Sequence, residues 1–182
     1  MNIRHFFLQI NLKVNNFVKL KLVAQYEKVR YYSVLIEGNK YTEFEKFIIH
    51  HRHDPKIKEE FNDLLQWIKD SIGTRFGALS KYFRHEGAAD GLPPQAKYLQ
   101  IDYEENLRLY CYRITDHIVI LFNGGIKTKG IEKSQDCEIV KQHFTLANKL
   151  TNAINEEFKS KELVISEDQR ELIFEKTFEI VI

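Results

Sequence analysis

The chain has 182 residues, of which 43% are hydrophobic and 29% are charged. This length and composition predict one globular domain with its own core and exclude an intrinsically disordered chain. Lys and Arg number 27 against 26 Asp and Glu, so the net charge of +1 excludes nucleic-acid binding through an overall basic surface. Any such binding has to come from local clustering of cations.

The two cysteines, Cys111 and Cys137, fit no disulfide or metal-binding spacing, and we expect both to be thiols in a reducing compartment. No apolar run reaches the length of a transmembrane helix. Polar residues interrupt the apolar pieces of the first 22 residues, which is untypical of a signal peptide. The sequence therefore predicts a cytoplasmic protein without membrane contact, metal site or cofactor.

Residues 1–22 are expected to form an N-terminal extension. Apolar and polar residues alternate there, which fits either an edge strand or a poorly ordered leader; the alternating apolar residues are Ile10, Leu12 and Val14. The run Tyr31–Glu37 is rich in aromatic and β-branched residues and predicts a strand. Gly38 and Asn39 predict a hairpin-type turn after it, with a brief return of the chain at Lys40 and Tyr41.

Two amphipathic helices are expected next, joined as a hairpin. Thr42 begins the first helix, with Glu45 at the spacing of a capping box. Asp54 followed by Pro55 predicts the start of the second helix, because Asp is a good N-cap and Pro is favoured at the first helical position. Gly73 and Gly77 predict its end. Apolar residues recur in it at the helical period: Ile57, Phe61, Leu64, Leu65, Ile68 and Ile72.

A connection over residues 78–96 leads to a predicted three-stranded antiparallel meander. The strands are expected at Lys97–Tyr103, Leu107–Ile114 and Ile118–Phe122, because runs of Tyr, Ile, Leu and Val are separated there by polar turn residues. The third strand is apolar throughout, which is typical of a central strand covered on both faces. We expect it to end at Asn123-Gly124-Gly125, where two glycines permit an abrupt change of backbone direction.

A long helix is predicted from Ser134 or Asp136 to about Lys161. Its apolar row, at the helical period, is Ile139, His143, Ala147, Leu150, Ile154 and Phe158. Alternation from Thr177 to Ile182 predicts a last strand. The expected organisation is an N-terminal extension (1–22), a single α+β domain (23–161) and a C-terminal extension (162–182).

The middle strand of the predicted meander carries the most chemistry. Alternation of side chains places Arg108, Tyr110 and Tyr112 on one face. That face suits a phosphate-rich partner, because Arg binds phosphate in a bidentate manner and Tyr stacks on bases. Ordinary half-buried tyrosines beside a solvated arginine are the alternative. Lys127 and Lys129, which follow the third strand, form either a basic edge near this face or ordinary loop lysines.

The order of strand, helical hairpin, three-stranded antiparallel meander and terminal helix resembles the RelE/ParE superfamily of bacterial toxins, in particular its HigB-like, phage-derived branch. The stretches that carry the resemblance are Leu107–Tyr110, Ile118–Phe122 and Gly124–Lys129. The resemblance implies the toxin of a type II toxin-antitoxin pair, which cuts messenger RNA on the ribosome. It also implies an antitoxin partner, often of the helix-turn-helix type, that covers the toxin.

The resemblance further implies roles for individual residues. Arg108 matches the middle-strand arginine that contacts the scissile phosphate, and together with Tyr110 and Lys127 it would form the catalytic group. Contacts to RNA would come from Lys97, Tyr112, Lys129 and Arg84. The reaction would be attack of a ribose 2′-hydroxyl on its own phosphate, without a metal. The general base stays open among His85, Tyr110, Tyr112, Asp116 and His117.

Two other functions remain open at this stage. A ParE-like toxin would inhibit gyrase or another protein target without catalysis, and the missing general base favours it. A catalytically degenerate member would only bind a partner. The histidine-rich segment His50–His53 resembles a metal site, but no further His or Cys lies at a matching spacing, so we predict a turn between helices there.

Overall fold

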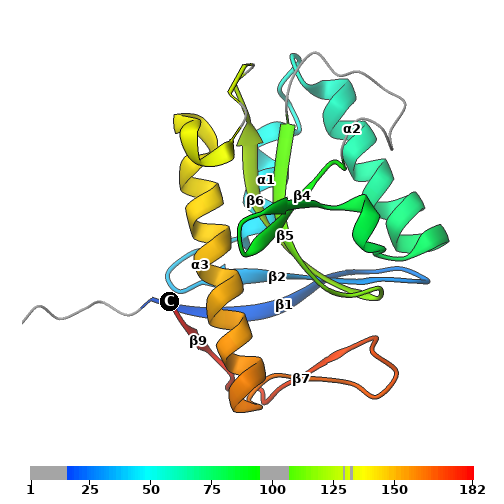
Figure 1. Ribbon diagram of the computed structural model, residues 1–182, viewed down its shortest axis with the longest axis vertical. Coiled ribbons are helices and arrows are strands. Elements are labelled where there is room, and N and C mark those ends of the chain that lie inside the picture. The colour runs from blue at the N-terminus through cyan, green and yellow to red at the C-terminus, as the bar shows by residue number, and fades with distance from the viewer. Residues whose placement is uncertain (1–15, 95–106, 129, 132) are drawn as a thin grey trace, which may run out of the picture.

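The computed structural model describes residues 16–94, 107–128, 130–131 and 133–182, and a seven-stranded mixed sheet organises them (Figure 1). The strand order is β3-β4-β5-β6-β2-β1-β9. Only the β2–β6 pair is parallel among the described pairs of this sheet. The strands are β1 (Phe17–Gln25), β2 (Arg30–Ile36), β3 (Arg84–Glu86), β4 (Ala89–Leu92), β5 (Leu107–Thr115), β6 (Ile118–Ile126) and β9 (Ile180–Val181). The α+β class is therefore confirmed.

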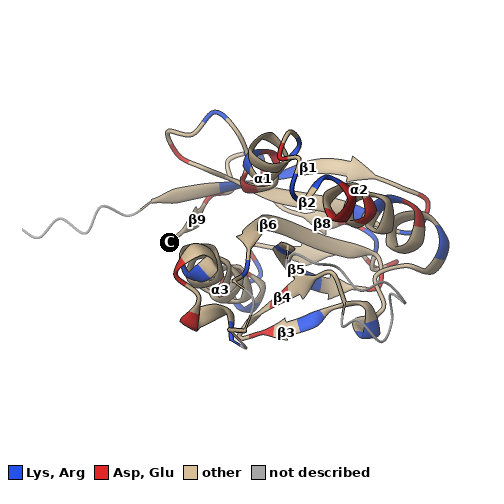
Figure 2. Ribbon diagram, turned by 90° about the horizontal axis from the view of Figure 1, so that it is seen from above, with Lys and Arg blue, Asp and Glu red and all other residues tan. Residues whose placement is uncertain are grey.

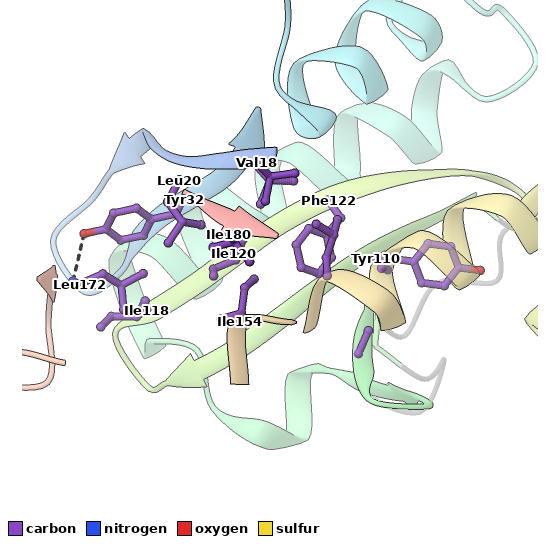
Figure 3. Close-up of a cluster of buried hydrophobic side chains, with 14 of the residues drawn as sticks. Val18, Leu20, Tyr32, Tyr110, Ile118, Ile120, Phe122, Ile154, Leu172 and Ile180 are labelled. Carbon is purple, nitrogen blue, oxygen red and sulfur yellow. Dashed lines mark hydrogen bonds between the residues drawn. The ribbon is translucent and has the colours of Figure 1, made fainter. Parts of the chain in front are cut away.

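The central strands divide their side chains between two hydrophobic cores, one on each face of the sheet. On β6, Ile118, Ile120 and Phe122 belong to one core, while Val119 and Leu121 belong to the other. Every one of these side chains is buried, as expected for a strand covered on both faces. Figure 3 shows the first core, in which the Tyr32 hydroxyl also accepts a hydrogen bond from the backbone N–H of Leu172 (3.2 Å).

Three α-helices cover the sheet: α1 (Glu43–His51), α2 (Lys58–Gln66) and α3 (Glu138–Ser160). In Figure 2, α1 and α2 lie on one side of β5 and β6, and α3 lies on the other. The capping box of α1 is confirmed, because the Thr42 side chain accepts from the Glu45 N–H (3.2 Å) and the Glu45 carboxylate accepts from the Thr42 N–H (2.7 Å). Within the described residues, no helix has the length and apolarity needed to cross a membrane.

The start of the second helix was predicted wrongly. Helix α2 begins at Lys58, with Ile57 as its N-cap, because the Asp54 carboxylate accepts from the Lys56 N–H (3.0 Å) and closes a turn instead. The helix continues as the π-helical segment η1 (Trp67–Phe76) and ends at Gly77, whose φ of 81° favours glycine. Gly73 lies inside η1, and no strand forms at Lys40 and Tyr41.

The segment 78–96, predicted to be a connection, contains the short strands β3 and β4. Strand β4 pairs antiparallel with β5, with Leu92 opposite Leu109, and thereby occupies that edge of β5. The strand expected at Lys97–Tyr103 lies outside the described residues. The meander that the structure describes is therefore β4-β5-β6.

Strand β6 does not end at Phe122 but continues to Ile126, and it contains a β-bulge. Leu109 pairs with Gly124 and Cys111 with Leu121, so two residues of β6, Phe122 and Asn123, lie opposite Tyr110 alone. The extra residue reverses the alternation beyond the bulge. Gly125 consequently faces α3, where a Cβ would lie 3.4 Å from Val140 Cγ1, and the side chain of Lys127 follows on the same face.

Both ends of the described part of the chain, from residue 16 to residue 182, join the same sheet as its centre. Strand β1 has buried side chains at Val18 and Leu20 and continues past residue 22, across the expected boundary of the N-terminal extension. The last strand expected from alternation is β9, which pairs antiparallel with β1. Before it, a small hairpin of β7 (Val164–Ile165) and β8 (Leu172–Ile173) packs against the first core through Leu172.

The long helix α3 forms as predicted, but it begins a few residues later than expected. Ser134–Asp136 form a 3-10 turn, η4, and Cys137 rather than Ser134 or Asp136 is the N-cap of α3. The buried residues of α3 are Val140, Ala147, Leu150, Thr151 and Ile154. Ile139, expected in the apolar row, is exposed, because Val140 takes its place on the buried face, two helical turns before Ala147.

Gly124 is expected to be intolerant of a side chain. A Cβ there would collide with the carbonyl oxygen of Arg108, which belongs to rigid paired backbone. Gly124→Ala should therefore lower the free energy of unfolding by about 2–3 kcal/mol, measured by urea denaturation. Gly125→Ala is the matched control and should change it by less than about 1 kcal/mol, because a Cβ at Gly125 meets only ordinary contacts. Equal losses in the two variants would contradict the bulge geometry.

Candidate functional site

Three cations from different strands converge on the face of the sheet that α3 covers. Arg84 comes from β3, Arg108 from β5, and Lys127 directly follows β6. We call these three residues the basic cluster. The bulge in β6 is what joins Lys127 to the other two: strict alternation from Phe122 would have placed Lys127 on the opposite face.

The cations of the basic cluster are close enough to repel one another. Burial, and after it the charge of Arg108, lowers the pKa of Arg84 to about 10. The pKa of Lys127 is lowered by burial and then by Arg108 and Arg84. Arg108 is 6% exposed and Lys127 is 9% exposed, so solvent screens these charges only weakly. A site of this kind favours an anion, which would relieve the repulsion.

Arg84 and Arg108 are held in place by backbone carbonyls. The Arg84 Nε donates to the Pro93 oxygen (2.7 Å) and its Nη2 to the Pro94 oxygen (2.9 Å). The Arg108 Nη1 donates to the Leu107 oxygen (2.9 Å). Arg84 therefore fixes the chain after β4 and contributes charge to the cluster, while two of its donors are already used.

Glu86 is the acidic residue that influences every member of the cluster. Its charge raises the pKa of Arg84, Arg108 and Lys127, in opposition to the larger effect of burial. One carboxylate oxygen, Oε2, accepts a hydrogen bond from the Ser134 hydroxyl in η4 (2.8 Å). Glu86 is half-buried on β3, so it places a fixed carboxylate beside three cations.

Tyr110 lies on the same face of β5 as Arg108, as alternation predicts. Its side chain is fully buried, and burial, the largest influence, raises the pKa of the hydroxyl to about 12. The phenol is therefore protonated at neutral pH and is unsuited to act as a general base. Its ring packs edge-on against Phe144 of α3 at 6.0 Å, which gives it a structural role as well.

Cys137 adds a thiol at the N-terminus of α3. Burial, the largest effect, raises the pKa of this thiol. The side chain and N–H of Thr128 and the nearby N–H groups of Ile139 and Val140 together outweigh it and bring the pKa down to about 7. The Thr128 N–H lies 3.4 Å from the Cys137 Sγ. Cys137 also influences the pKa values of Tyr110 and Lys127, so it borders the basic cluster.

The other residues proposed from sequence are distributed differently. Tyr112 donates from its hydroxyl to Asn155 Oδ1 of α3 (2.6 Å), which ties it to the helix. Lys97 and Lys129 lie outside the described residues. The structure thus brings Arg84, Arg108, Tyr110 and Lys127 together, and it places Tyr112 in the packing between β5 and α3.

Three further candidates for the general base make contacts outside the basic cluster. His85 is 97% exposed, with its Nδ1 3.8 Å from Asp90 Oδ1. Asp116 pairs with Arg113, and His117 Nδ1 contacts the Lys28 oxygen (2.8 Å). Glu86, Ser134 and Cys137 were missed from sequence, because they come from β3, η4 and the start of α3 and share no local spacing.

Among the residues that the structure describes, no group of three or more His, Cys, Asp or Glu side chains is arranged to hold a metal ion. Comparisons of the chain with protein-family models, with curated proteins and with solved structures found no match. The function is therefore argued from the site itself.

Titration of the two thiols will test the electrostatics at the start of α3. Burial raises the pKa of Cys111 well above its usual value, whereas that of Cys137 is about 7. The thiolate absorbance at 240 nm should therefore rise in one step near pH 7. We expect Cys111→Ser to keep this step and Cys137→Ser to remove it. A first step above pH 8.5 would show that the hydrogen bonds from Thr128 and α3 do not stabilise the thiolate.

Proposed function

We propose that this protein is a RelE/HigB-like toxin of a type II toxin-antitoxin pair that cuts messenger RNA on the ribosome. The observation that carries the proposal is the convergence of Arg84, Arg108 and Lys127 around one carboxylate, Glu86. Cleavage of RNA develops negative charge on a phosphate, and preorganised cations at a site of low solvent exposure stabilise such charge strongly.

The proposed reaction is transfer of the phosphate within the RNA chain. Glu86 takes the proton from a ribose 2′-hydroxyl, and the 2′-oxygen forms a bond to the adjacent phosphorus. The bond from phosphorus to the 5′-oxygen of the next nucleotide breaks, and Lys127 gives that oxygen a proton. The products are a 2′,3′-cyclic phosphate and a free 5′-hydroxyl. Arg108 binds the phosphate oxygens throughout.

The chemistry of each residue supports its proposed role. A carboxylate that already accepts a hydrogen bond from Ser134 is fixed in orientation, as a general base should be. The lowered pKa of Lys127 makes it a better proton donor than an ordinary lysine. Tyr110 stays protonated and is a structural neighbour of the phosphate-binding residues in this proposal, in place of the catalytic role that the resemblance implied.

The arrangement of elements also supports the proposal. A helical pair, α1 and α2, precedes the antiparallel strands β4, β5 and β6, and α3 follows them. This order is compatible with the one that the RelE resemblance implies, with β4 in the place of the strand expected at Lys97–Tyr103 and within a larger sheet. An antitoxin protein, of the helix-turn-helix type, is the partner proposed on the same grounds.

A ParE-like inhibitor of a protein target is the second candidate. It is favoured by the burial of the two residues at the centre of the strand face, since Tyr110 is fully buried and Arg108 nearly so. A toxin of this kind needs no access to Arg108. Induced expression would then arrest growth without RNA cleavage and would block DNA supercoiling in a gyrase assay.

Arg108→Gln is expected to lower RNA cleavage by roughly 10²- to 10³-fold, because it removes a cation from the phosphate. The measurement is cleavage of a messenger RNA on purified ribosomes, with circular dichroism as the check of folding. Arg75→Gln is the matched control, since Arg75 is an exposed arginine of η1 outside the cluster. Full cleavage by a folded Arg108→Gln variant would remove Arg108 from the site.

Glu86→Gln should lower cleavage by roughly 10²- to 10⁴-fold through loss of the general base. The amide keeps the shape of the side chain and the acceptor for Ser134, so folding should be retained. A general base predicts that the acidic limb of the pH–rate profile disappears in this variant. If the variant keeps that limb, proton transfer takes place through another group.

A further inference from the structure

A second site lies between α1, β6 and α3, apart from the basic cluster. It is a cavity of about 620 Å³, within the range that holds small-molecule ligands. Three histidines line it: His50 and His51 at the end of α1, and His143 on α3. Gly124 and Gly125 of β6 also line it. We call this cavity the histidine pocket.

His51 is the residue that indicates a bound ligand. Its side chain is only 4% exposed, and its Nε2 has no hydrogen-bond partner among the described residues. Leaving a buried polar nitrogen without a hydrogen-bond partner costs free energy, so such groups are uncommon. A bound ligand can supply the missing hydrogen bond. The ring itself is fixed, because it packs against Phe47 at 4.8 Å and against His50 at 4.6 Å.

The lysines that line the pocket lie beside carboxylates, so the fixed charges around the pocket balance. The ammonium of Lys46 lies 2.6 Å from a Glu43 carboxylate oxygen, and the other oxygen of Glu43 accepts from Asn123 (3.1 Å). Asp54 offsets Lys56 in the same wall. Among the described lining residues, the imidazoles of His51 and His143 can then add positive charge.

The residues that line the pocket favour a ligand with an anionic group and an apolar part. The imidazoles donate hydrogen bonds to an anion when protonated. Ile126 and Ile139 line the cavity as well, and Ile139 is 57% exposed although it is a large apolar residue. An apolar wall beside a set of imidazole donors fits a phosphate monoester with a planar or apolar body, such as a mononucleotide.

We propose that the histidine pocket binds a phosphate-bearing small molecule of mononucleotide size, with His51 Nε2 donating a hydrogen bond to the phosphate. This site is independent of the proposed RNA cleavage, because it uses none of Arg84, Arg108, Lys127 or Glu86. Binding takes up protons, so affinity for the anion increases as the pH falls.

The direction of the pH dependence follows from the surroundings of each ring. Burial lowers the pKa of His51, and the neighbouring His50 lowers it further, while the Gly124 backbone and Asp54 oppose this. Burial also lowers the pKa of His143, with Glu43 opposing and His50 adding to the effect. Both rings are consequently neutral near pH 7 and gain protons below pH 6.5, the usual value for histidine.

Sulfate is the first probe, because it stays a dianion throughout and leaves only the protein to titrate. It is added to the full chain at pH 5.5 and pH 7.5, and the imidazole ¹⁵N signals of His51 and His143 are followed by NMR. We expect both signals to shift, with affinity at least ~10-fold higher at pH 5.5. His51→Gln should abolish the shift at His143, and His53→Gln, which changes an exposed histidine outside the pocket, should preserve it.

Adenosine 5′-monophosphate and adenosine then test the ligand class at pH 5.5. The phosphate-bearing probe should bind at least ~10-fold more tightly than adenosine, because only it offers an acceptor of strong charge-assisted hydrogen bonds. Arg108→Gln should bind both probes as the unmodified chain does, which separates this site from the basic cluster. Absence of any His51 shift with sulfate or the nucleotide in the unmodified chain would overturn the proposal, whether or not His51→Gln folds.

Discussion

The pairing of β5 with β6 through a bulge is the constraint on which the rest of the structure depends. Up to Phe122, the side chains of β6 alternate between two cores. One set packs on the side of α3 and the other on the side of α1 and α2. The extra residue opposite Tyr110 then reverses this alternation, and the missing side chain of Gly124 lets the backbone of Arg108 approach. As a result Lys127 shares a face with Arg108. A regular hairpin of the same residues would separate the two cations by the thickness of the sheet.

The same short segment borders both sites. Gly125 lies opposite Arg108 in the pairing of β5 with β6, and together with Gly124 it also lines the histidine pocket. The described pairing of β2 with β6 ends at Ser33 and Leu121, and the cavity is lined by the part of β6 that follows, together with α1 and α3. Both sites therefore border the bulge between β5 and β6.

Local sequence patterns predicted most helices and strands. Strand pairings and contacts between residues far apart in the sequence were missed. The capping box of α1 depends on Thr42 and Glu45 alone, and it is present. Asp54 before Pro55 has the same local signature as an N-cap, but its carboxylate closes a turn. Strands β3 and β4 have residues of low strand propensity and form because β5 offers an edge to pair with. Alternation placed Arg108 and Tyr110 together, whereas Glu86 and Ser134 meet only in three dimensions.

Both sites carry an electrostatic cost that an anion would reduce. In the basic cluster, burial and mutual repulsion lower the pKa values of Arg84 and Lys127, and Glu86 compensates only in part. In the histidine pocket, burial keeps His51 and His143 neutral and leaves the Nε2 of His51 without a partner among the described residues. Buried groups of this kind lower the stability of the empty protein, and they persist where binding or chemistry uses them. The two sites differ in one respect: the cluster is charged at neutral pH, while the pocket becomes so only in acid. An anion would therefore stabilise the cluster at neutral pH, and it would stabilise the pocket only when proton uptake accompanies binding.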